Sequence, residues 1–269
     1  MALAAYSAKN ILAAATQWIG VTATVPWNLA ASTSAVDPAF AAQNVAKGRA
    51  GMVCRAKNTA PFQLGVNLAL PAAASVCALV NHNLRPTAEV WLAHASSQSG
   101  PWTWIEVPIT EGACWVPLAL ASRRYWRLIV EGVQTVDGRP VQIGEWWLGE
   151  LVDLPPFVWG AELGEATTDA FGESEYGVPN AHFLSTRRTF AGSFSKALPE
   201  ASAVAVEAFK RQVQGRVKPF LFTPDKDDRS RVMLGRLADA SWQRQLVLPG
   251  RVDGADFAFR EDPWGKTGA

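Results

Sequence analysis

The chain has 269 residues, 49% apolar and 18% charged, so it can build a full hydrophobic core and does not have the composition of a disordered protein. Its formal net charge of +1 excludes the strongly basic surface that nucleic-acid binding usually needs. The length allows one large β domain or two smaller ones, and there is no run of about 18 apolar residues that could cross a membrane as a helix.

The N-terminal segment, residues 1–40, is predicted to be irregular, with a short strand beginning near Asn10 and turns at Pro26 and Pro38. Its Ala-rich start makes a poor signal peptide, because the first charged residue, Lys9, comes late and no clean cleavage site follows.

Three cysteines, Cys54, Cys77 and Cys114, have spacings that match no zinc or thioredoxin pattern. Their odd number argues against a disulfide framework and favours synthesis in a reducing cytosol. Since Cys54 and Cys77 lie inside apolar runs, we expect them to be small buried hydrophobic residues.

A buried strand is predicted at Ser75–Val80, where a short apolar run ends at two amides that flank an imidazole, Asn81, His82 and Asn83. We expect these three polar side chains to hydrogen-bond the neighbouring backbone. A catalytic His82 is the alternative, but no Ser, Cys or carboxylate partner is evident. A second short strand is predicted at Ala88–Ala95.

Two tryptophans, Trp102 and Trp104, share one parity in the next predicted strand, residues 101–109. They could form an exposed pair for sugar stacking or a protein contact, or they could pack over a neighbouring strand, which is the favoured interpretation. Twelve tryptophans in all suggest that the protein has large contact surfaces beyond its cores.

The clearest strand is Arg124–Val130, and its alternation predicts two distinct faces. One face carries Trp126, Leu128 and Val130, and the other carries Tyr125, Arg127 and Ile129. A final strand of this region is predicted at Val141–Leu148. Strands that follow one another at short intervals without a strong helix are typical of an all-β sandwich.

A domain boundary is predicted at Asp153-Leu154-Pro155-Pro156, because two prolines stiffen the chain and block strand pairing. We therefore divide the chain into domains at residues 1–153 and 157–269. The second domain has one predicted helix, residues 199–214, that begins at Pro199 and stops at Gly215. Its strands, among them Arg187–Phe194 and Val217–Phe222, are expected to offer unpaired edges.

The motifs of common enzyme classes are missing from the sequence: there is no GxxxxGK[ST] phosphate loop, no GxSxG elbow and no HExxH. The run Asp225–Asp228 lacks the glycine and the distal glutamate of a calcium loop. Carboxylates for glycoside hydrolysis could come from Glu162, Glu165, Glu173 and Glu175, but solvation of a polar segment explains them better. We expect no enzyme, no metal and no cofactor.

An ordered set of segments in the first half carries a family resemblance. The set comprises Asn44-Val45, Arg49, Val53–Ala56, Phe62–Val66, Val80–Leu84, Tyr125–Leu128 and Ile143–Gly149. Over about residues 5–150 the chain resembles the discoidin-like (galactose-binding-like) jelly roll, in the form found in bacteriophage tail proteins. In such jelly rolls early loops form a ligand rim, so the resemblance adds Trp27 to Trp102 and Trp104 as candidate carbohydrate or partner contacts.

The second half, about residues 157–262, resembles the ring-forming hub domains of siphophage distal tail and minor tail proteins. The resemblance is carried by Arg188, Phe190, Gly192 and Phe194, by the helix, by Lys218–Phe222 with Pro224-Asp225, and by Leu234–Leu237. In that family a β-barrel with one helix assembles into a ring that continues the tail tube. The familiar order, ring domain first and jelly roll second, is reversed here.

The two resemblances imply a mainly β protein, with an N-terminal β-sandwich jelly roll and a smaller β-barrel-like domain with one α-helix. They imply a structural component of a phage tail tip or baseplate, a ring of three or six copies in contact with other tail proteins. It would be made in the host cytoplasm, reside in the virion without membrane insertion, and meet DNA only as it passes through the channel. The alternative is a carbohydrate-binding protein that reads a cell-surface glycan through the jelly roll.

Overall fold

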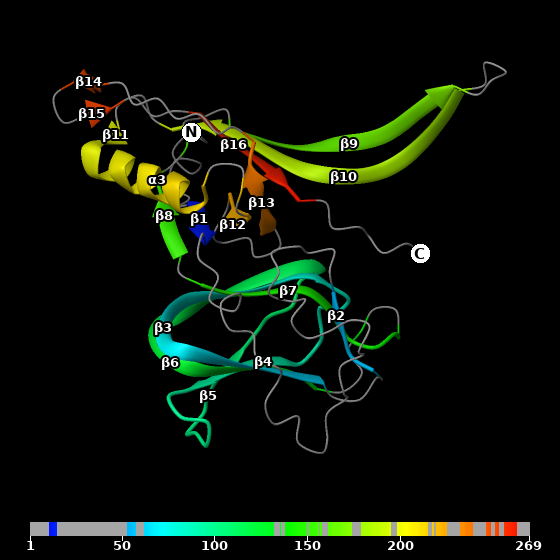
Figure 1. Cartoon of the computed structure of the whole chain (residues 1–269), viewed down its shortest axis with the longest axis vertical. Coiled ribbons are helices and arrows are strands. Elements are labelled where there is room, and N and C mark those ends of the chain that lie inside the picture. Colours follow the sequence, from blue (N-terminus) through cyan, green and yellow to red (C-terminus); the bar gives the residue numbers. More distant parts are fainter. Residues whose placement is uncertain are drawn as a thin grey trace, which may run out of the picture. The chain divides into compact units, whose positions relative to one another are not determined.

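A computed structural model gives the structure of the chain (Figure 1). It describes residues 11–14, 53–57, 62–131, 135, 138–149, 151–155, 157, 161–173, 179–194, 198–214, 217, 219–224, 232–238, 246–248, 251–252 and 256–262. Over these ranges the protein is mainly β, with one six-stranded, one seven-stranded and one three-stranded sheet and a single α-helix. This confirms the predicted fold class. No helix in these ranges is long and apolar enough to span a membrane.

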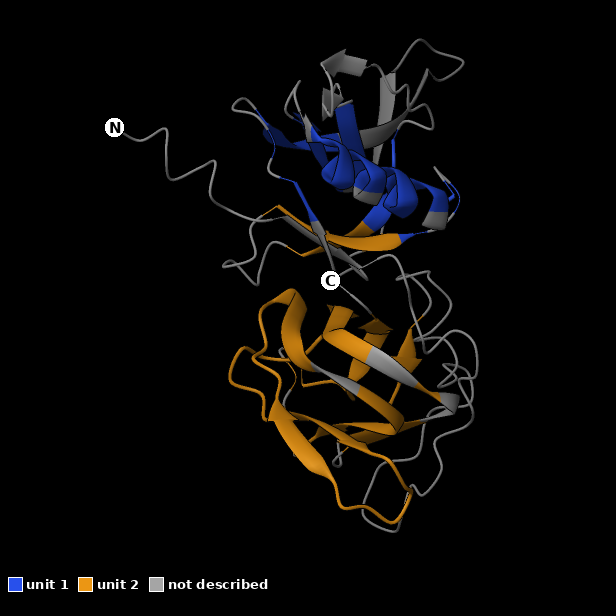
Figure 2. Cartoon of the chain, turned by 90° about the vertical axis from the view of Figure 1, so that its left-hand side faces the viewer, with its two compact units in different colours: residues 1–9, 154–219, 235–269 blue, residues 10–153, 220–234 orange. Residues whose placement is uncertain are grey.

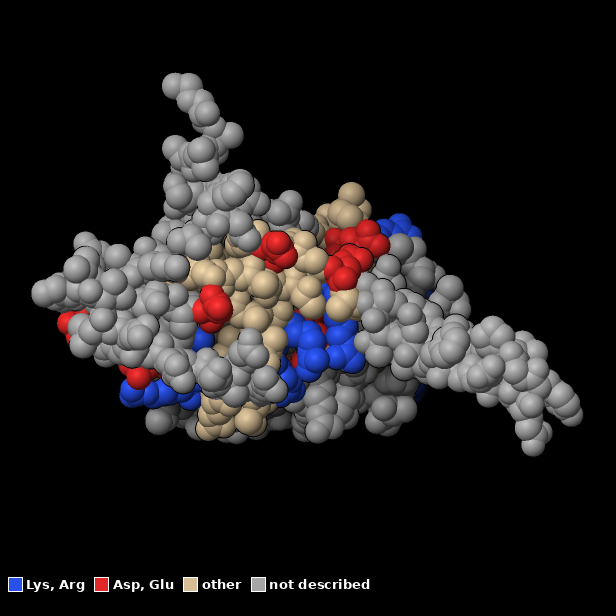
Figure 3. Space-filling view, turned by 90° about the horizontal axis from the view of Figure 1, so that it is seen from above, with Lys and Arg blue, Asp and Glu red and all other residues tan. Residues whose placement is uncertain are grey.

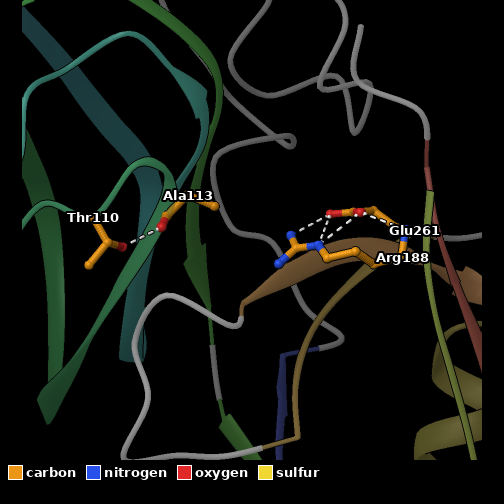
Figure 4. A network of polar contacts seen from close by, with 4 residues as sticks. All are labelled: Thr110, Ala113, Arg188 and Glu261. Atoms are coloured by element: carbon orange, nitrogen blue, oxygen red, sulfur yellow. Dashed lines mark hydrogen bonds and ion pairs between the residues drawn. The ribbon is translucent and has the colours of Figure 1, made fainter. Parts of the chain in front are cut away.

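The six-stranded sheet forms the predicted β-sandwich, in the strand order β2-β7-β3-β6-β4-β5. Its strands are β2 (Cys54–Arg55), β3 (Phe62–His82), β4 (Val90–Ala95), β5 (Thr103–Glu106), β6 (Gly112–Val130) and β7 (Gln142–Gly149). The Thr110 hydroxyl donates to the Ala113 carbonyl oxygen and helps to set the turn into β6 (Figure 4).

Two long bent strands, β3 and β6, connect the layers of the sandwich (Figure 1). One end of their pairing, residues 62–67 with 125–130, lies beside β4, and the other end, residues 76–82 with 112–117, lies beside β7. The register shifts between Asn67 and Ala72, where β3 passes through Pro71. Such irregularities bend a strand, so a single pair of strands can serve both layers.

The core of the sandwich confirms the predicted faces of the β6 strand. Trp126 is 1% exposed, and Leu128 and Val130 are fully buried, whereas Arg127 and Ile129 on the other face are half-buried. The inward residues of β6 meet Leu79 and Trp146 among others in one hydrophobic cluster. The predicted strand at Ser75–Val80 is part of the longer β3.

The seven-stranded sheet has the order β8-β1-β12-β13-β16-β10-β9. Its strands are β1 (Ile11–Ala14), β8 (Leu151–Leu154), β9 (Glu162–Glu173), β10 (Pro179–Ser193), β12 (Phe220–Thr223), β13 (Met233–Leu237) and β16 (Asp256–Glu261). The three-stranded sheet pairs β11 (Leu198–Pro199), β15 (Arg251–Val252) and β14 (Leu246–Leu248).

The helix α3 spans Glu200–Gln212, close to the predicted 199–214. Pro199 precedes it and Glu200 lies in its first turn, where an acidic side chain favours the helix dipole. One face of the helix is apolar and buried, and it carries Val206, Phe209 and Val213. The predicted stop at Gly215 lies outside the described residues.

Two compact units divide the chain, and neither is one continuous segment (Figure 2). The sandwich unit comprises residues 10–153 and 220–234, and the second unit comprises residues 1–9, 154–219 and 235–269. The predicted boundary after Asp153 coincides with one of the points at which the chain passes between units. Strand β1 pairs with β12, which brings Leu12 opposite Thr223. That segments 1–153 and 157–269 fold independently stays a prediction, which limited proteolysis between Asp153 and Gly164 can test.

The predicted unpaired edges at Arg187–Phe194 and Val217–Phe222 are wrong. Strand β10 lies between β9 and β16, and β12 lies between β1 and β13, so both have a partner on each side. The edges of this sheet are β8 and β9 instead. Alternation along a strand shows which side chains share a face, but it does not show which strands will come to lie beside it.

Candidate functional site

The outer face of the sandwich layer formed by β4, β5 and β6 carries the candidate site. In β4 and β6, Leu92 and Leu128 point into the core and are fully buried. Successive residues of a strand point to opposite faces, so Ala93 and Arg127 lie on the outer side. The outer face of this layer also carries Trp91, Trp104 and Glu106, which share this parity.

Strand register places three outer residues in one row across the layer. Arg127 of β6 is opposite Ala93 of β4, and Ala93 is in turn opposite Trp104 of β5. In the next row Ile129 is opposite Trp91, which is opposite Glu106. Trp104 thus lies two strands from Arg127, with Ala93 between them, and two residues from Glu106 in its own strand.

Trp104 is the exposed aromatic residue of this group, with 52% of its surface accessible. Indole is a large, flat and mostly apolar surface, so leaving it in water forgoes the stabilisation that burial would give. A single exposed apolar residue is ordinary on a protein surface. Its setting beside Arg127 and Trp102 is the feature that gives it functional interest.

Trp102 is half-buried, and the Arg127 guanidinium carbon lies 4.0 Å from the centre of its ring. This is a cation–π contact that holds the two side chains against one another. Partial burial lowers the pKa of Arg127 from its ordinary value, but a guanidinium remains charged at neutral pH. The pair is therefore a fixed platform with a positive charge.

The loop before Trp102 is shaped to admit its indole. Gly100 has a φ of +94°, which glycine adopts readily, and a Cβ at this position would come within 3.0 Å of Trp102 Cδ1. The Ser97 hydroxyl donates to the Gly100 carbonyl oxygen at 2.6 Å, and the Gly100 N–H donates to the Ser97 carbonyl oxygen at 3.2 Å. These contacts fix the turn from which Trp102 starts.

The three predicted contact residues have different outcomes. Trp102 and Trp104 lie on the same hairpin with the parity that the sequence indicates, and their contact with a ligand stays a prediction. Trp27 lies outside the described residues. Sequence reasoning missed Arg127 as a member of the site, although the alternation of its strand had placed it on the face opposite Trp126.

Two side chains of the polar strand end, those of His82 and Asn83, hydrogen-bond the backbone as predicted. Asn83 donates to the Pro140 carbonyl oxygen at 3.0 Å and accepts from the Gln142 N–H at 2.8 Å. His82 Nδ1 accepts from the Leu84 N–H at 3.3 Å, and burial lowers the pKa of His82 to about 4. The imidazole is thus neutral and tied to the backbone near neutral pH.

The cysteines are buried thiols, which confirms the prediction for Cys54 and Cys77. Burial raises the pKa of Cys54 and Cys114 to about 12 and raises that of Cys77 as well, so none of them is a reactive thiolate at neutral pH. In the part of the chain that the structure describes, no three His, Cys, Asp or Glu side chains could together hold a metal ion.

Of the four glutamates considered for glycoside hydrolysis, Glu162 and Glu165 are exposed on β9. Glu173 ends β9, and Glu175 lies outside the described residues. Absence of an enzymatic activity stays a prediction.

Comparison with known proteins gives structural likenesses only. No protein-family model matches the chain, and no curated protein matches it. One solved structure that it resembles is chitosan-binding module 1 of a chitosanase/glucanase from Paenibacillus sp. IK-5, with 14% identity, a TM-score of 0.36, and coverage of 44% of this chain and 93% of that one.

Two further likenesses are at the same level. A fucose-binding module of Streptococcus pneumoniae is 13% identical with a TM-score of 0.35, covering 43% of this chain and 93% of its own. The lectin domain of lectinolysin complexed with Lewis B antigen is 14% identical with a TM-score of 0.33, covering 44% and 89%. Each likeness is weak and covers less than half of this chain.

Proposed function

We propose that the β-sandwich unit is a carbohydrate-binding module that uses the outer face of β4, β5 and β6. The observation that carries the proposal is Trp104, which is 52% exposed beside the stacked pair Trp102 and Arg127. The role is binding rather than catalysis.

The chemistry of this face suits a sugar. A pyranose has an apolar C–H face and a rim of hydroxyl groups, so it needs a flat apolar surface with hydrogen-bonding groups at its border. An indole supplies such a surface, and Arg127 and Glu106 supply donors and acceptors. Trp102 and Trp104 are two residues apart in the chain, so their Cα atoms are roughly 7 Å apart along it.

The test is binding of the full chain to a panel of immobilised neutral, amino and acidic oligosaccharides, with the Trp104→Ala variant beside it. We expect the wild type to retain at least one oligosaccharide and the variant to lose most of that binding. Leu163→Ala, which removes an exposed apolar side chain of the second unit, is the control and should bind as the wild type does. If Trp104→Ala binds the oligosaccharide as tightly as the wild type does, the proposed site is wrong.

A second candidate is a structural component of a phage tail tip, a distal tail or minor tail protein located in the virion. In this role three or six copies form a ring that continues the tail tube, with other tail proteins above and below and DNA only passing through. The protein is then made in the host cytoplasm and does not insert into a membrane. The sandwich would sit at the periphery and reach other tail proteins or the host surface.

The observation that favours this second candidate is the long β9–β10 ribbon (Figure 1). Its register runs from Pro179 opposite Glu173 to Ala191 opposite Glu162, while β16 accompanies β10 only over residues 189–193. Strand β9 is the edge of its sheet, and a free edge of this length offers backbone groups to a further chain. A contact of this head-to-tail kind closes into a ring where the rotation permits.

Electron microscopy of the purified protein and of a virion tail tip separates the two candidates. A closed ring on the tail axis supports the structural role, and a position away from that axis excludes it. A stable monomer that binds an oligosaccharide favours the carbohydrate-binding module.

A further inference from the structure

On the face drawn in Figure 3, Lys and Arg form several groups, and the group near the middle has acidic side chains close to it. Within the second unit, arginines concentrate on one face of the sheet formed by β10, β16 and β13. In β16, Phe257 and Phe259 are buried, while Ala258 and Arg260 alternate with them on the other side. This second side is the face considered below.

Three arginines from three strands come together on this face. Thr189 of β10 is opposite Arg260 of β16, and Arg260 is opposite Arg236 of β13. Arg187 lies two residues before Thr189, and Asp262 lies two residues after Arg260, so both have the spacing of residues on this same side of the sheet. Arg187, Arg236 and Arg260 thus surround one carboxylate.

Asp262 neutralises only one of the three. Arg236 Nε donates to both carboxylate oxygens of Asp262, at 3.1 and 3.0 Å. Arg236 Nη1 also donates to the Val217 carbonyl oxygen. Burial raises the pKa of Asp262, and the charges of Arg236, Arg260 and Arg187 oppose that rise. Among the described residues, no hydrogen bond and no close ion pair is made by the side chain of Arg187 or by that of Arg260.

On the inner face of the same strands, by contrast, the arginine has a carboxylate partner. Arg188 is turned toward buried Glu261, donates to it from Nε and Nη2, and adds a hydrogen bond from its backbone N–H (Figure 4). An arginine with a bidentate carboxylate partner is charge-balanced. The outer cluster, with three arginines and one aspartate, has a surplus of two positive charges.

The surface around the arginines is low and accessible. Gly164 and Ala191 are exposed, and Thr189 and Ala258 are half-buried. These small residues leave room for an extended chain to lie against the sheet, within reach of the long Arg187 and Arg260 side chains. A planar guanidinium matches the geometry of a carboxylate.

We propose that this face, defined by Arg187, Arg260 and the small residues Gly164, Thr189, Ala191 and Ala258 beside them, docks an extended acidic segment of a partner protein. Aspartate or glutamate side chains of that segment pair with the two arginines. Nucleic acid is the less suitable polyanion, because it engages many cations. The arginine cluster has a surplus of only two positive charges, and farther along the strands Glu162 and Asp256 lie on the same side of the sheet. The inference is independent of carbohydrate binding by the sandwich.

The probe is a fluorescently labelled peptide of four glutamates alternating with alanines, followed by anisotropy with the full chain at low salt. We expect binding that Arg187→Gln/Arg260→Gln weakens about tenfold or more, since charge-assisted hydrogen bonds are lost. Arg211→Gln is the matched control: Arg211 is exposed on α3, pairs with Glu207, and should leave binding unchanged. Arg260→Gln alone, at an exposed position, should weaken binding by a smaller factor and serves if the double variant fails to fold.

Three results with peptides would overturn the proposal: no binding of the acidic peptide, equal binding by the double variant, or equal binding of a lysine–alanine peptide. A single-stranded oligonucleotide of the same charge that binds more tightly than the peptide would also overturn it, in favour of a nucleic-acid surface.

Discussion

Trp126 and Trp104 occupy opposite faces of the same layer of the sandwich and have opposite roles. Trp126 is 1% exposed and belongs to the core, whereas Trp104 is 52% exposed and is not part of it. The two residues have the same chemistry, and the parity of their strands decides which of them stabilises the fold. The comparison shows that an apolar residue on the outer face is available for a ligand because the inner face already supplies the core.

The largest expected effect comes from the inner face. Trp126→Ala should lower the free energy of unfolding by roughly 3–5 kcal/mol, because it leaves a large cavity beside Leu128 and the ring of His94. The Trp126 Nε1–H also donates to the Arg123 carbonyl oxygen at 3.3 Å, and that bond is lost. Urea unfolding measures the change, and a loss below about 1 kcal/mol would mean that the faces of the layer are reversed.

The buried imidazoles of His82 and His94 should make the free energy of unfolding depend on pH. Burial lowers the pKa of His82 to about 4, and burial followed by the charge of Arg123 lowers that of His94. Between pH 6.5 and about 4 the unfolded chain therefore binds more protons than the folded one, so stability falls as the pH falls through this window. His82 alone should contribute roughly 3 kcal/mol of this loss.

The measurement is the free energy of unfolding at several pH values, for the wild type and for His82→Gln. The variant is expected to have a shallower decline between pH 6.5 and 4. A decline as steep as that of the wild type would assign the pH dependence to other groups.

A smaller effect is expected at the hairpin that positions the outer face. Gly100→Ala places a Cβ within 3.0 Å of Trp102 at a φ of +94°, so it should cost about 1–2 kcal/mol of stability and shift the indole. Tryptophan fluorescence and binding of the retained oligosaccharide should both change. An alanine variant with wild-type stability and binding would show that the turn does not set the platform.

The sequence allowed the faces of individual strands to be predicted, since alternation along Arg124–Val130 is a local signal. The partners across strands could not be predicted, because the stack of Arg127 on Trp102 depends on the pairing of β6 with β4 and of β4 with β5. The same limit explains the error at the supposed edge strands and the unforeseen pairing of β1 with β12, whose partners are far apart in the sequence. Local pattern determines orientation, and register is decided by tertiary contacts.

The smallest expected effect on stability is at Trp104, and it tests the comparison most directly. Trp104→Ala removes a side chain that is half in solvent, so the free energy of unfolding should change by no more than about 0.5 kcal/mol. Binding of the retained oligosaccharide should nevertheless fall, because the flat apolar surface on which the sugar lies is gone while Arg127 and Trp102 stay in place. Thermal unfolding and binding are measured on the same preparation. If the substitution costs as much stability as Trp126→Ala, Trp104 is a structural residue, and the proposal that the outer face binds a sugar is contradicted. If stability and binding are both unchanged, the sandwich binds carbohydrate elsewhere or not at all.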